Sequence, residues 1–506
     1  MKDGFIRVAA ATPDIHVADP QYNSEQIIEL MEQGSTRGVK VMAFPELCLT
    51  AYTCSDLFLQ ESLLREAKKE LKRILQASKS KDMILFVGMP WMHKGKLYNV
   101  AAVLNRGRIL GIVPKKHLPN YSEFYELRHF NPGMEKVEMT DWEGVQVPMG
   151  MNLLFACRTM PELVLAAELC EDVWVPCPPS ISHALAGATV IANCSASDET
   201  TGKDQYRYNL ICGQSARLVC GYIYANAGEG ESSQDLVFGG QNIIAENGTC
   251  LVQSDRFKNA CICADLDLGR IISERRRMTT FRDEENRSAS YETVYFELNT
   301  EDSAKKDSKK AGQKRDELLR YIDPAPFVPH DAGQRERRCE EILSIQAMGL
   351  KKRLAHTNCK HAVIGLSGGL DSTLALLVTV RAFDMLQIPR ENIHCITMPC
   401  FGTTDRTYTN ACTMAKKTGA SLTEINIRDA VTGHFKDINH DIEKHDVTYE
   451  NGQARERTQI LMDIANEVGG MVIGTGDMSE LALGWATYNG DRMSMYGVNA
   501  AVPKTL

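Results

Sequence analysis

Short apolar segments alternate with amphipathic ones from Arg7 to about Phe296. The apolar segments have the length and composition of buried β-strands. They are Arg7 to Ala11, Val39 to Phe44, Met83 to Met89, Leu163 to Leu169, Thr189 to Asn193 and Gly221 to Ala225. Residues 61–77 place leucine and isoleucine on one helical face and charged side chains on the other, which predicts a surface helix. The pattern predicts a layered α/β domain over residues 1–298.

The pattern changes between Asn299 and Arg320, where lysines and acids are interspersed and apolar residues are few. A solvated linker or an exposed helix fits this composition better than a nucleic-acid site, and we expect a linker over 299–330. A second α/β domain is expected over 331–506. Its helical patterns cover 332–354 and 373–383, and its strand-like runs cover 361–366, 393–398 and 471–473. This order favours a doubly wound parallel sheet, in which ligands bind at the carboxyl ends of the strands.

Composition narrows the class of protein. With 43% hydrophobic and 24% charged residues and a formal net charge of −8, the chain has no general electrostatic attraction to nucleic acid. No apolar stretch of 18 residues occurs, so we expect no membrane partner. The 16 cysteines form no CxxC pair, and Cys261 and Cys263 form only a CxC within a strand-like pattern. We therefore expect reduced thiols and a cytoplasmic location.

The hexapeptide from Ser367 to Ser372, SGGLDS, directly follows the strand-like run 361–366. Two glycines, two serine hydroxyls and the start of a helix form a turn suited to binding phosphate. Asp371 would repel phosphate unless a divalent cation such as Mg²⁺ lies between them. The loop lacks the lysine of GxxxxGK[ST], so the common phosphoryl-transfer loop does not fit. The alternative is a plain glycine-rich strand-to-helix turn.

At these residues SGGLDS resembles the pyrophosphate loop of the ATP pyrophosphatases. That family activates a carboxylate or carbonyl group by adenylation and then adds nitrogen or sulfur. The resemblance implies that ATP is cleaved at its α-phosphorus and that the chain has a source of nitrogen.

Glu46, Lys115 and Cys170 each follow a strand-like run in the first half. Together they suffice for amide hydrolysis, because the carboxylate removes the thiol proton, the thiolate attacks the amide carbon and the ammonium stabilises the oxyanion. The carboxylate can then return the proton to the leaving ammonia. The alternative is a buried cysteine at a strand end with commonplace acids and lysines.

The local sequences favour hydrolysis. FPEL at Glu46, PKKHLPNYSEFYE from Pro114 and ELCEDVWVPCPPS around Cys170 resemble the three signatures of the nitrilase (carbon–nitrogen hydrolase) superfamily. With YENGQARERTQIL from Tyr449 and GTGDMSELALGWATYNGD from Gly474, the whole chain resembles the glutamine-dependent NAD⁺ synthetases. The resemblance implies an N-terminal α-β-β-α sandwich fused to a doubly wound ATP-pyrophosphatase domain.

Several residue roles follow from the resemblance. Glu46, Lys115 and Cys170 match the catalytic set, and Tyr121, Ser197 and Lys203 match glutamine-binding positions, although the last position is commonly arginine in the family. Glu126 is either a second carboxylate near the nucleophile or a surface acid that caps a helix.

In the second domain the resemblance assigns three sets of residues. Asp371 and Glu480 match Mg²⁺ ligands. The ATP-binding positions are Ser367, Gly368, Gly369, Leu370, Asp371, Ser372 and Thr475. The positions facing deamido-NAD⁺ are Asn451, Arg457, Glu480, Trp485, Ala486, Thr487 and Tyr488, with core packing as the alternative for Trp485 and Tyr488.

The implied reaction is a relay between two sites. Glutamine forms a thioester on Cys170 and releases ammonia, which converts an adenylate of deamido-NAD⁺ into NAD⁺ and AMP. The implied partners are L-glutamine, ATP and deamido-NAD⁺, in a dimer-based homo-oligomer of up to eight subunits. Family members usually continue beyond the position of Leu506, into a helical segment with further substrate contacts that include a lysine. Another amidotransferase of the ATP-pyrophosphatase type, and a chain that retains only glutaminase or binding function, remain as alternatives.

Overall fold

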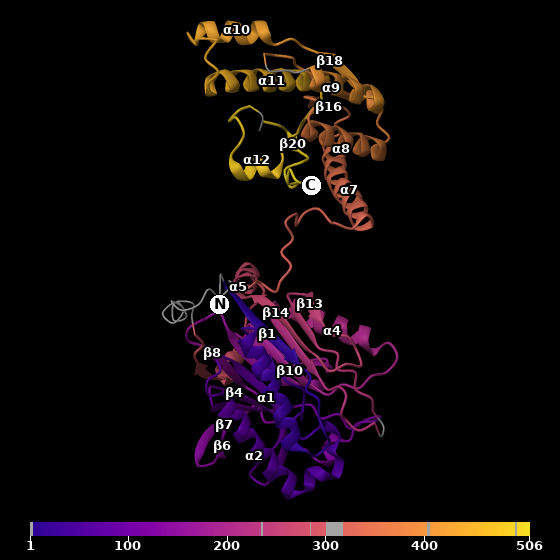
Figure 1. The fold of residues 1–506 in the computed structure, drawn as a ribbon. Helices are drawn as coiled ribbons and strands as arrows, with labels where there is room; N and C mark the ends of the chain where they lie inside the picture. The colour runs from indigo at the N-terminus through magenta and orange to yellow at the C-terminus, as the bar shows by residue number, and fades with distance from the viewer. Residues whose placement is uncertain (1–3, 234–235, 284, 300–316, 402–404, 491–492) are drawn as a thin grey trace. The chain divides into compact units, whose positions relative to one another are not determined.

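The computed structural model describes residues 4–233, 236–283, 285–299, 317–401, 405–490 and 493–506. The chain divides into two compact units, Met1–Tyr321 and Ile322–Leu506 (Figure 1). The lysine-rich part of the expected linker, from Lys305 to Arg315, lies outside the described residues.

Unit 1 contains two β-sheets. The first has the spatial order β14 (Cys261–Asp267), β1 (Phe5–Ala11), β2 (Val41–Ala43), β3 (Ile84–His93), β4 (Lys96–Asn105), β5 (Arg108–Pro114), β7 (Val145–Met149) and β6 (Glu138–Trp142). The second has the order β13 (Thr249–Gln253), β12 (Ile243–Glu246), β11 (Gly221–Asn226), β10 (Val190–Ser195), β9 (Val164–Leu169), β8 (Leu153–Cys157) and β15 (Glu292–Phe296).

Strand alternation explains how the layers stack. In β1, Val8 and Ala10 point into the core between the sheets, whereas Ala9 and Ala11 pack under the helices on the other face. Phe86 of β3 meets Phe155 of β8 across the two sheets, with ring centroids 6.3 Å apart.

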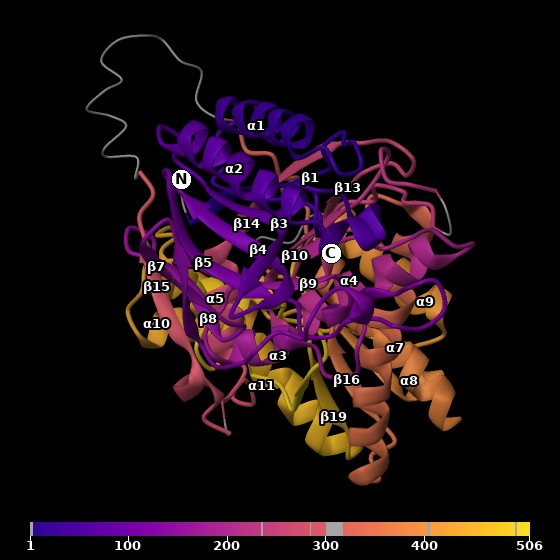
Figure 2. The same ribbon diagram turned by 90° about the horizontal axis from the view of Figure 1, so that it is seen from below.

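Helices cover the outer face of each sheet of unit 1. α1 (Pro20–Thr36) and α2 (Glu61–Ser78) lie together on the first sheet (Figure 2), and α3 (Pro179–Leu185) and α4 (Lys203–Leu218) cover the second. α5 (Leu268–Arg277) directly follows β14. The expected α-β-β-α sandwich is confirmed.

The end of the expected linker contacts unit 1. Arg320 forms an ion pair with the buried Glu246, at 2.7 Å, and the N–H of Leu319 donates to Asp265 at 2.6 Å. The chain next becomes regular at α7 (Ala332–His356), while the boundaries at 298 and 330 stay predictions.

Unit 2 is built on a five-stranded parallel sheet. Its order is β18 (Ser421–Glu424), β17 (Ile393–Thr397), β16 (Ala362–Gly365), β19 (Met471–Gly474) and β20 (Tyr496–Gly497). α7, α8 (Leu370–Leu386) and α9 (Asp405–Thr418) pack on one face, and α10 (Arg428–Asp437) and α11 (Val447–Val468) pack on the other (Figure 1). This is the expected doubly wound architecture.

The strand order of unit 2 reverses between β16 and β19. From β16 the chain builds outward through β17 and β18, and then returns to the other side of β16 to form β19 and β20. Loops that diverge at such a switch point leave a crevice at the carboxyl ends of the strands, where ligands bind. The loops after β16 and β19 carry SGGLDS and GTGD.

The second half of the SGGLDS hexapeptide is helical, although the sequence predicted a turn there. We expected helix from Thr373, but α8 begins at Leu370, so Leu370, Asp371 and Ser372 form its first turn. The helix therefore presents Asp371 at its N-terminal end.

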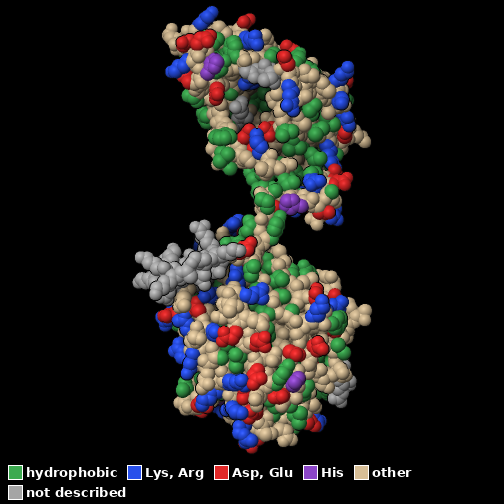
Figure 3. Space-filling model, viewed as in Figure 1, with side chains coloured by type: hydrophobic (Ala, Val, Ile, Leu, Met, Phe, Trp, Pro, Cys, Tyr) green, Lys and Arg blue, Asp and Glu red, His purple; other side chains and the backbone are tan. Residues whose placement is uncertain are grey.

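The surface agrees with the charge balance of the sequence. Acidic and basic side chains are interspersed on the face of each unit seen in Figure 3. Within the described residues, every helix is too short or too polar to cross a bilayer. All 16 cysteines are free thiols.

Two candidate active sites

Glu46, Lys115 and Cys170 come together in unit 1, at the ends of β2, β5 and β9. The side chains of Glu46 and Lys115 are fully buried, and Cys170 is 5% exposed. Lys115 Nζ lies 2.6 Å from Glu46 Oε1, so the ion pair is shielded from water. The expected acid, ammonium and thiol form one cluster.

Glu126 belongs to the same cluster. Its Oε1 lies 2.6 Å from Lys115 Nζ and accepts a hydrogen bond from the hydroxyl of Tyr52 at 2.8 Å. Burial raises the pKa of Glu126 to about 7; Lys115 opposes this increase, and Glu46 adds to it. Because Glu126 is only 4% exposed, the structure excludes a surface acid and supports a second carboxylate near Cys170.

Cys170 has the strained backbone that is common at reactive residues. It begins the 3₁₀ turn η3 (Cys170–Val173) with a φ of 38°, which a residue with a Cβ adopts only when its surroundings impose it. Burial raises the pKa of its thiol, Glu46 raises it further and Lys115 lowers it. The resting thiol is therefore protonated, and attack on an amide requires a base beside it.

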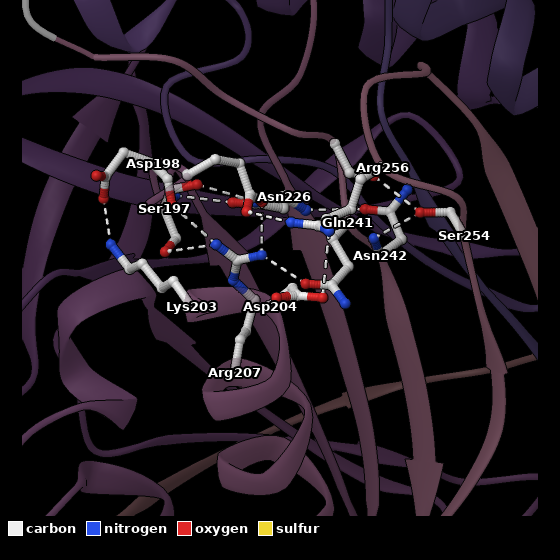
Figure 4. Close-up of polar contacts among 12 residues, drawn as sticks. Ser197, Asp198, Lys203, Asp204, Arg207, Asn226, Gln241, Asn242, Ser254 and Arg256 are labelled. Carbon is white, nitrogen blue, oxygen red and sulfur yellow. Dashed lines mark hydrogen bonds and ion pairs between the residues drawn. The ribbon is translucent and has the colours of Figure 1, made fainter. Parts of the chain in front are cut away.

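Lys203 is the first residue of α4, and Ser197 lies in the segment between β10 and α4 (Figure 4). The residue before Ser197 contacts the cluster, because the N–H of Ala196 donates to Glu46 Oε2 at 3.0 Å. Lys203 pairs with the buried Asp198, and its ammonium lies 5.5 Å from the ring centroid of Trp174 and 5.8 Å from that of Phe124. Such contacts hold a cation in one place. The Lys203 position therefore offers a fixed positive charge.

Tyr121 is exposed but points toward the same region. Its hydroxyl donates to Glu171 Oε1 at 2.8 Å, and Glu171 directly follows Cys170. The Tyr121 ring packs edge-on against Phe124, which also contacts Lys203. Glu171 thus places a carboxylate next to Cys170, and Lys203 lies near enough to Glu171 to influence its pKa, an arrangement that suits the charged groups of a free amino acid.

The SGGLDS segment of unit 2 is ordered by its own hydroxyls. Ser367 Oγ lies 3.1 Å from Ser372 Oγ and accepts from the N–H of Gly369 at 3.2 Å. Within the described residues, no side chain caps α8 at Gly369. The N-terminal N–H groups of α8 are thus available to an anion.

Asp371, Asp477 and Glu480 form a cluster of carboxylates. One oxygen of each lies within 4.8 Å of the others. Three hard oxygen donors at this spacing suit Mg²⁺, so the residues fit the expected ion. Asp477 was not among the residues expected to bind metal.

Lys504 contacts all three of these carboxylates. Its Nζ lies 3.0 Å from Asp371 Oδ2, 3.2 Å from Asp477 Oδ2 and 3.3 Å from Glu480 Oε1. The side chain of Lys504 is half exposed, whereas that of Asp477 is 4% exposed.

Two of the residues expected to face the second substrate are in contact. Asn451 of α11 accepts a hydrogen bond from Thr487 Oγ1 at 2.6 Å. Trp485 and Tyr488 are 77% and 81% exposed, which excludes core packing. Thr475, Arg457 and Ala486 are half-buried and lie on the loop after β19, on α11 and beside Thr487.

The two parts of the chain match two known protein families. Residues 7–276 match the carbon–nitrogen hydrolase family, and residues 342–504 match the NAD synthase family. A glutamine-dependent NAD(+) synthetase of Mycobacterium leprae is 42% identical over an alignment of 514 positions, which covers 99% of this chain and 74% of that protein. The chain belongs to the glutamine-dependent NAD(+) synthetase family.

More distant relatives cover the same span. The Aquifex aeolicus glutamine-dependent NAD(+) synthetase is 29% identical over 99% of this chain and 80% of its own. A solved structure of such an enzyme from Cytophaga hutchinsonii, 23% identical, covers 99% of this chain and 79% of that chain with a TM-score of 0.47. Members of this family are ATP-dependent ligases that also contain a nitrilase-type domain.

Residues that were not expected from the sequence support these sites. In this synthetase, Asp172 accepts from the N–H groups of Leu169, at 3.1 Å, and His117, at 2.9 Å, and so joins the segments that carry Cys170 and Lys115. Asn99 donates to Glu46 Oε1 at 2.6 Å. The only sequence signal for Asp172 was its place in the ELCEDVW string.

Asn499 supports the second site. Its Nδ2 donates to the carbonyl of Asp371, at 2.8 Å, and to that of Thr475, at 3.1 Å. One buried amide therefore ties together the two segments that follow β16 and β19, and no local motif marked it.

Proposed function

We propose that unit 1 hydrolyses L-glutamine and that unit 2 uses the ammonia, with ATP, to amidate deamido-NAD⁺ to NAD⁺. The observation that carries the first half is the strained, buried Cys170 beside the Glu46 and Lys115 ion pair. The second half is supported by family membership and by the phosphate-binding turn at the switch point of the parallel sheet.

In unit 1, Glu46 takes the proton of the Cys170 thiol as sulfur attacks the side-chain amide of glutamine. Lys115 stabilises the negative charge that develops on the carbonyl oxygen. Glu46 returns the proton to the departing nitrogen, so ammonia leaves and a thioester remains. Water then releases glutamate and restores the thiol.

Glutamine is held by groups around the thiol. Lys203, fixed by Asp198 and two aromatic rings, faces the α-carboxylate, and Tyr121 and Ser197 add hydrogen bonds. We assign Glu171 to the α-ammonium group, because its carboxylate adjoins Cys170 and is oriented by Tyr121. A cation with a fixed position recognises carboxylate whether it belongs to lysine or to arginine, although arginine would offer two donors.

In unit 2, the carboxylate of deamido-NAD⁺ attacks the α-phosphorus of ATP, giving an adenylate and pyrophosphate. Ammonia then attacks the activated carbonyl carbon and AMP leaves. Ser367 to Ser372 and Thr475 bind ATP, and Asn451, Arg457, Glu480 and Trp485 to Tyr488 face deamido-NAD⁺. Asp371 and Glu480 would hold Mg²⁺, which neutralises phosphate charge when bound.

We also propose a cytoplasmic location and a homo-oligomeric assembly. Free thiols throughout the chain are consistent with a reducing, cytoplasmic environment. We expect a dimer-based homo-oligomer, which light scattering would test.

The test compares two nitrogen sources in an NAD⁺ assay. Cys170→Ala should abolish NAD⁺ synthesis with glutamine and preserve it with ammonium chloride, whereas Asp371→Asn should abolish both. Equal loss of both activities in Cys170→Ala would contradict the assignment. A panel of carboxylic acids, scored by ATP-dependent pyrophosphate release, identifies another acceptor if deamido-NAD⁺ is inactive.

A further inference from the structure

The three carboxylates of unit 2 lie around the ammonium of Lys504. Asp371 comes from the start of α8, whereas Asp477 and Glu480 come from the loop after β19 and from α12 (Met478–Leu483). Carboxylate oxygens within 4.8 Å of one another repel unless a cation lies among them. In this structure Lys504 supplies that cation, at 3.0 to 3.3 Å from each.

The two carboxylate oxygens of Asp477 make different contacts. Its Oδ1 caps α12 by accepting from the N–H of Glu480 at 2.8 Å. Its Oδ2 is buried and faces Lys504 at 3.2 Å. A cap needs only the first oxygen, so the second leaves a negative charge aimed at whichever cation the site holds.

Lys504 can leave the carboxylates without unfolding its segment. Its backbone N–H donates to Ser479 Oγ at 3.0 Å, and the carbonyl of Val502 accepts from the N–H of Met478 at 3.0 Å. These bonds hold the main chain against the start of α12, and the half-exposed side chain is a flexible four-carbon stem.

We infer that Asp371, Asp477 and Glu480 form a cation-exchange site, in which the ammonium of Lys504 is the occupant until a divalent ion displaces it. The inference rests on the proposed Mg²⁺ site and adds Asp477 as its third carboxylate and Lys504 as its competitor. A divalent ion alone must displace an ion-paired lysine into water. An ion that arrives with a polyphosphate brings negative charge that receives the released ammonium, so metal and nucleotide bind cooperatively.

The test measures metal binding in the full chain without nucleotide or other substrate. Free Mn²⁺ is followed by electron paramagnetic resonance in wild type, Lys504→Met and Lys504→Arg, with the exposed lysine of α7, in Lys352→Met, as the matched control. We expect Lys504→Met to lower the Kd for Mn²⁺ at least about tenfold, because it removes the competing charge. Lys504→Arg and Lys352→Met should bind as wild type does.

A second comparison tests Asp477. Adding Asp477→Asn to Lys504→Met should raise the Kd again by about tenfold, because asparagine keeps the helix cap and removes one negative charge. Equal Mn²⁺ affinity in wild type and Lys504→Met would overturn the cation-exchange proposal, provided that thermal unfolding shows both proteins to be folded. Unchanged affinity on adding Asp477→Asn removes Asp477 from the site. Because the readout needs no catalysis, failure of NAD⁺ synthesis would leave it interpretable.

Discussion

Lys115 and Glu126 form a buried ion pair, with Nζ 2.6 Å from Oε1. Lys115 makes an equally short contact with Glu46, so one ammonium serves two carboxylates. Two negative charges and one positive charge in a site closed to water cannot all keep their ordinary pKa values. Burial raises the pKa of Glu126 to about 7, so this carboxyl group ionises over the pH range in which the enzyme would work.

Glutamine hydrolysis should therefore rise from pH 6 to pH 8. Above its pKa, Glu126 is ionised and holds Lys115 where the oxyanion forms; below it, that ion pair is lost. The apparent pKa belongs to the whole cluster because its members are coupled. Glu126→Gln should remove the rise and lower kcat/KM about 100-fold through misplacement of Lys115.

The measurement is a glutaminase assay across pH 5.5 to 9. The exposed Glu143→Gln, on the turn between β6 and β7, is the matched control and should keep the wild-type profile. A wild-type rate that is constant from pH 6 to 8 would contradict this role for Glu126.

Glu231 should act on the same cluster from a distance. Its carboxylate accepts from the N–H groups of Tyr52, at 2.8 Å, and Thr53, at 2.9 Å, and from the Thr53 hydroxyl. The backbone there is strained, because Ala51 has a φ of 77° and a ψ of 151°, a conformation that glycine normally occupies. Tyr52 in turn donates to Glu126.

Glu231→Gln should therefore lower kcat/KM for glutamine about tenfold and move the acidic limb of the pH profile upward, since the Tyr52 hydrogen bond favours ionised Glu126. Tyr52→Phe should do the same, and the double variant should be little worse than either. Glu229→Gln, exposed in the same loop, is the control. Additive losses in the double variant would show that Glu231 acts by another route.

The features of this protein that can be predicted from its sequence are those set by neighbouring residues along the chain. Buried strands and the residues that end them are marked by apolar runs, so the sequence alone places Glu46, Lys115 and Cys170 at strand ends. It does not place their partners, because Asp172, Asn99 and Glu231 act through contacts between segments far apart in sequence and carry no spacing pattern.

In unit 2, too, contacts between residues far apart in the sequence could not be predicted. Asp371 needs a cation on chemical grounds alone, and the structure supplies one that the sequence did not suggest, from Lys504, 133 residues away. Asn499 is likewise a buried polar residue whose two acceptors belong to different loops. Burial and partner choice depend on how the sheet is wound, which periodicity does not reveal.

His183 should make a contribution to the stability of unit 1 that is lost in mild acid. This side chain is 1% exposed, and its Nδ1 lies 2.7 Å from the hydroxyl of Tyr291. Burial lowers its pKa to about 4, below the unfolded value of about 6.5. Between these values the unfolded chain binds the proton and the folded chain does not, so stability is lost as pH falls.

His183→Gln should lose less stability than wild type between pH 7 and pH 5, by about 2 kcal/mol. The comparison must be between variants, because the raised pKa values of Glu126 and Asp172, both about 7, act in the opposite direction. Urea unfolding followed by tryptophan fluorescence reports mainly on unit 1, which contains Trp91, Trp142 and Trp174, because Trp485 of unit 2 is already exposed in the folded chain. Equal losses in the two proteins would mean that His183 is protonated when folded.

The two glycines of SGGLDS should differ sharply when substituted. Gly368 has a φ of 78°, and a Cβ there would lie 2.0 Å from the carbonyl oxygen of Thr407 in α9. A Cβ on Gly369 would meet only Ser367 Oγ, at 3.4 Å. Gly368 is therefore required by the packing of α9, whereas the sequence suggested that both glycines serve the ligand.

Gly368→Ala should destabilise unit 2 by about 2 kcal/mol and reduce ATP affinity, since strain and a backbone clash displace the turn. Gly369→Ala is the matched control for stability and should unfold at the wild-type temperature. Calorimetric titration with ATP then measures the ATP affinity of each variant, which distinguishes an effect on packing from an effect on ligand contact. Lower ATP affinity in a fully stable Gly369→Ala protein would show that phosphate approaches this residue, while similar stability losses in the two variants would contradict the distinction between them.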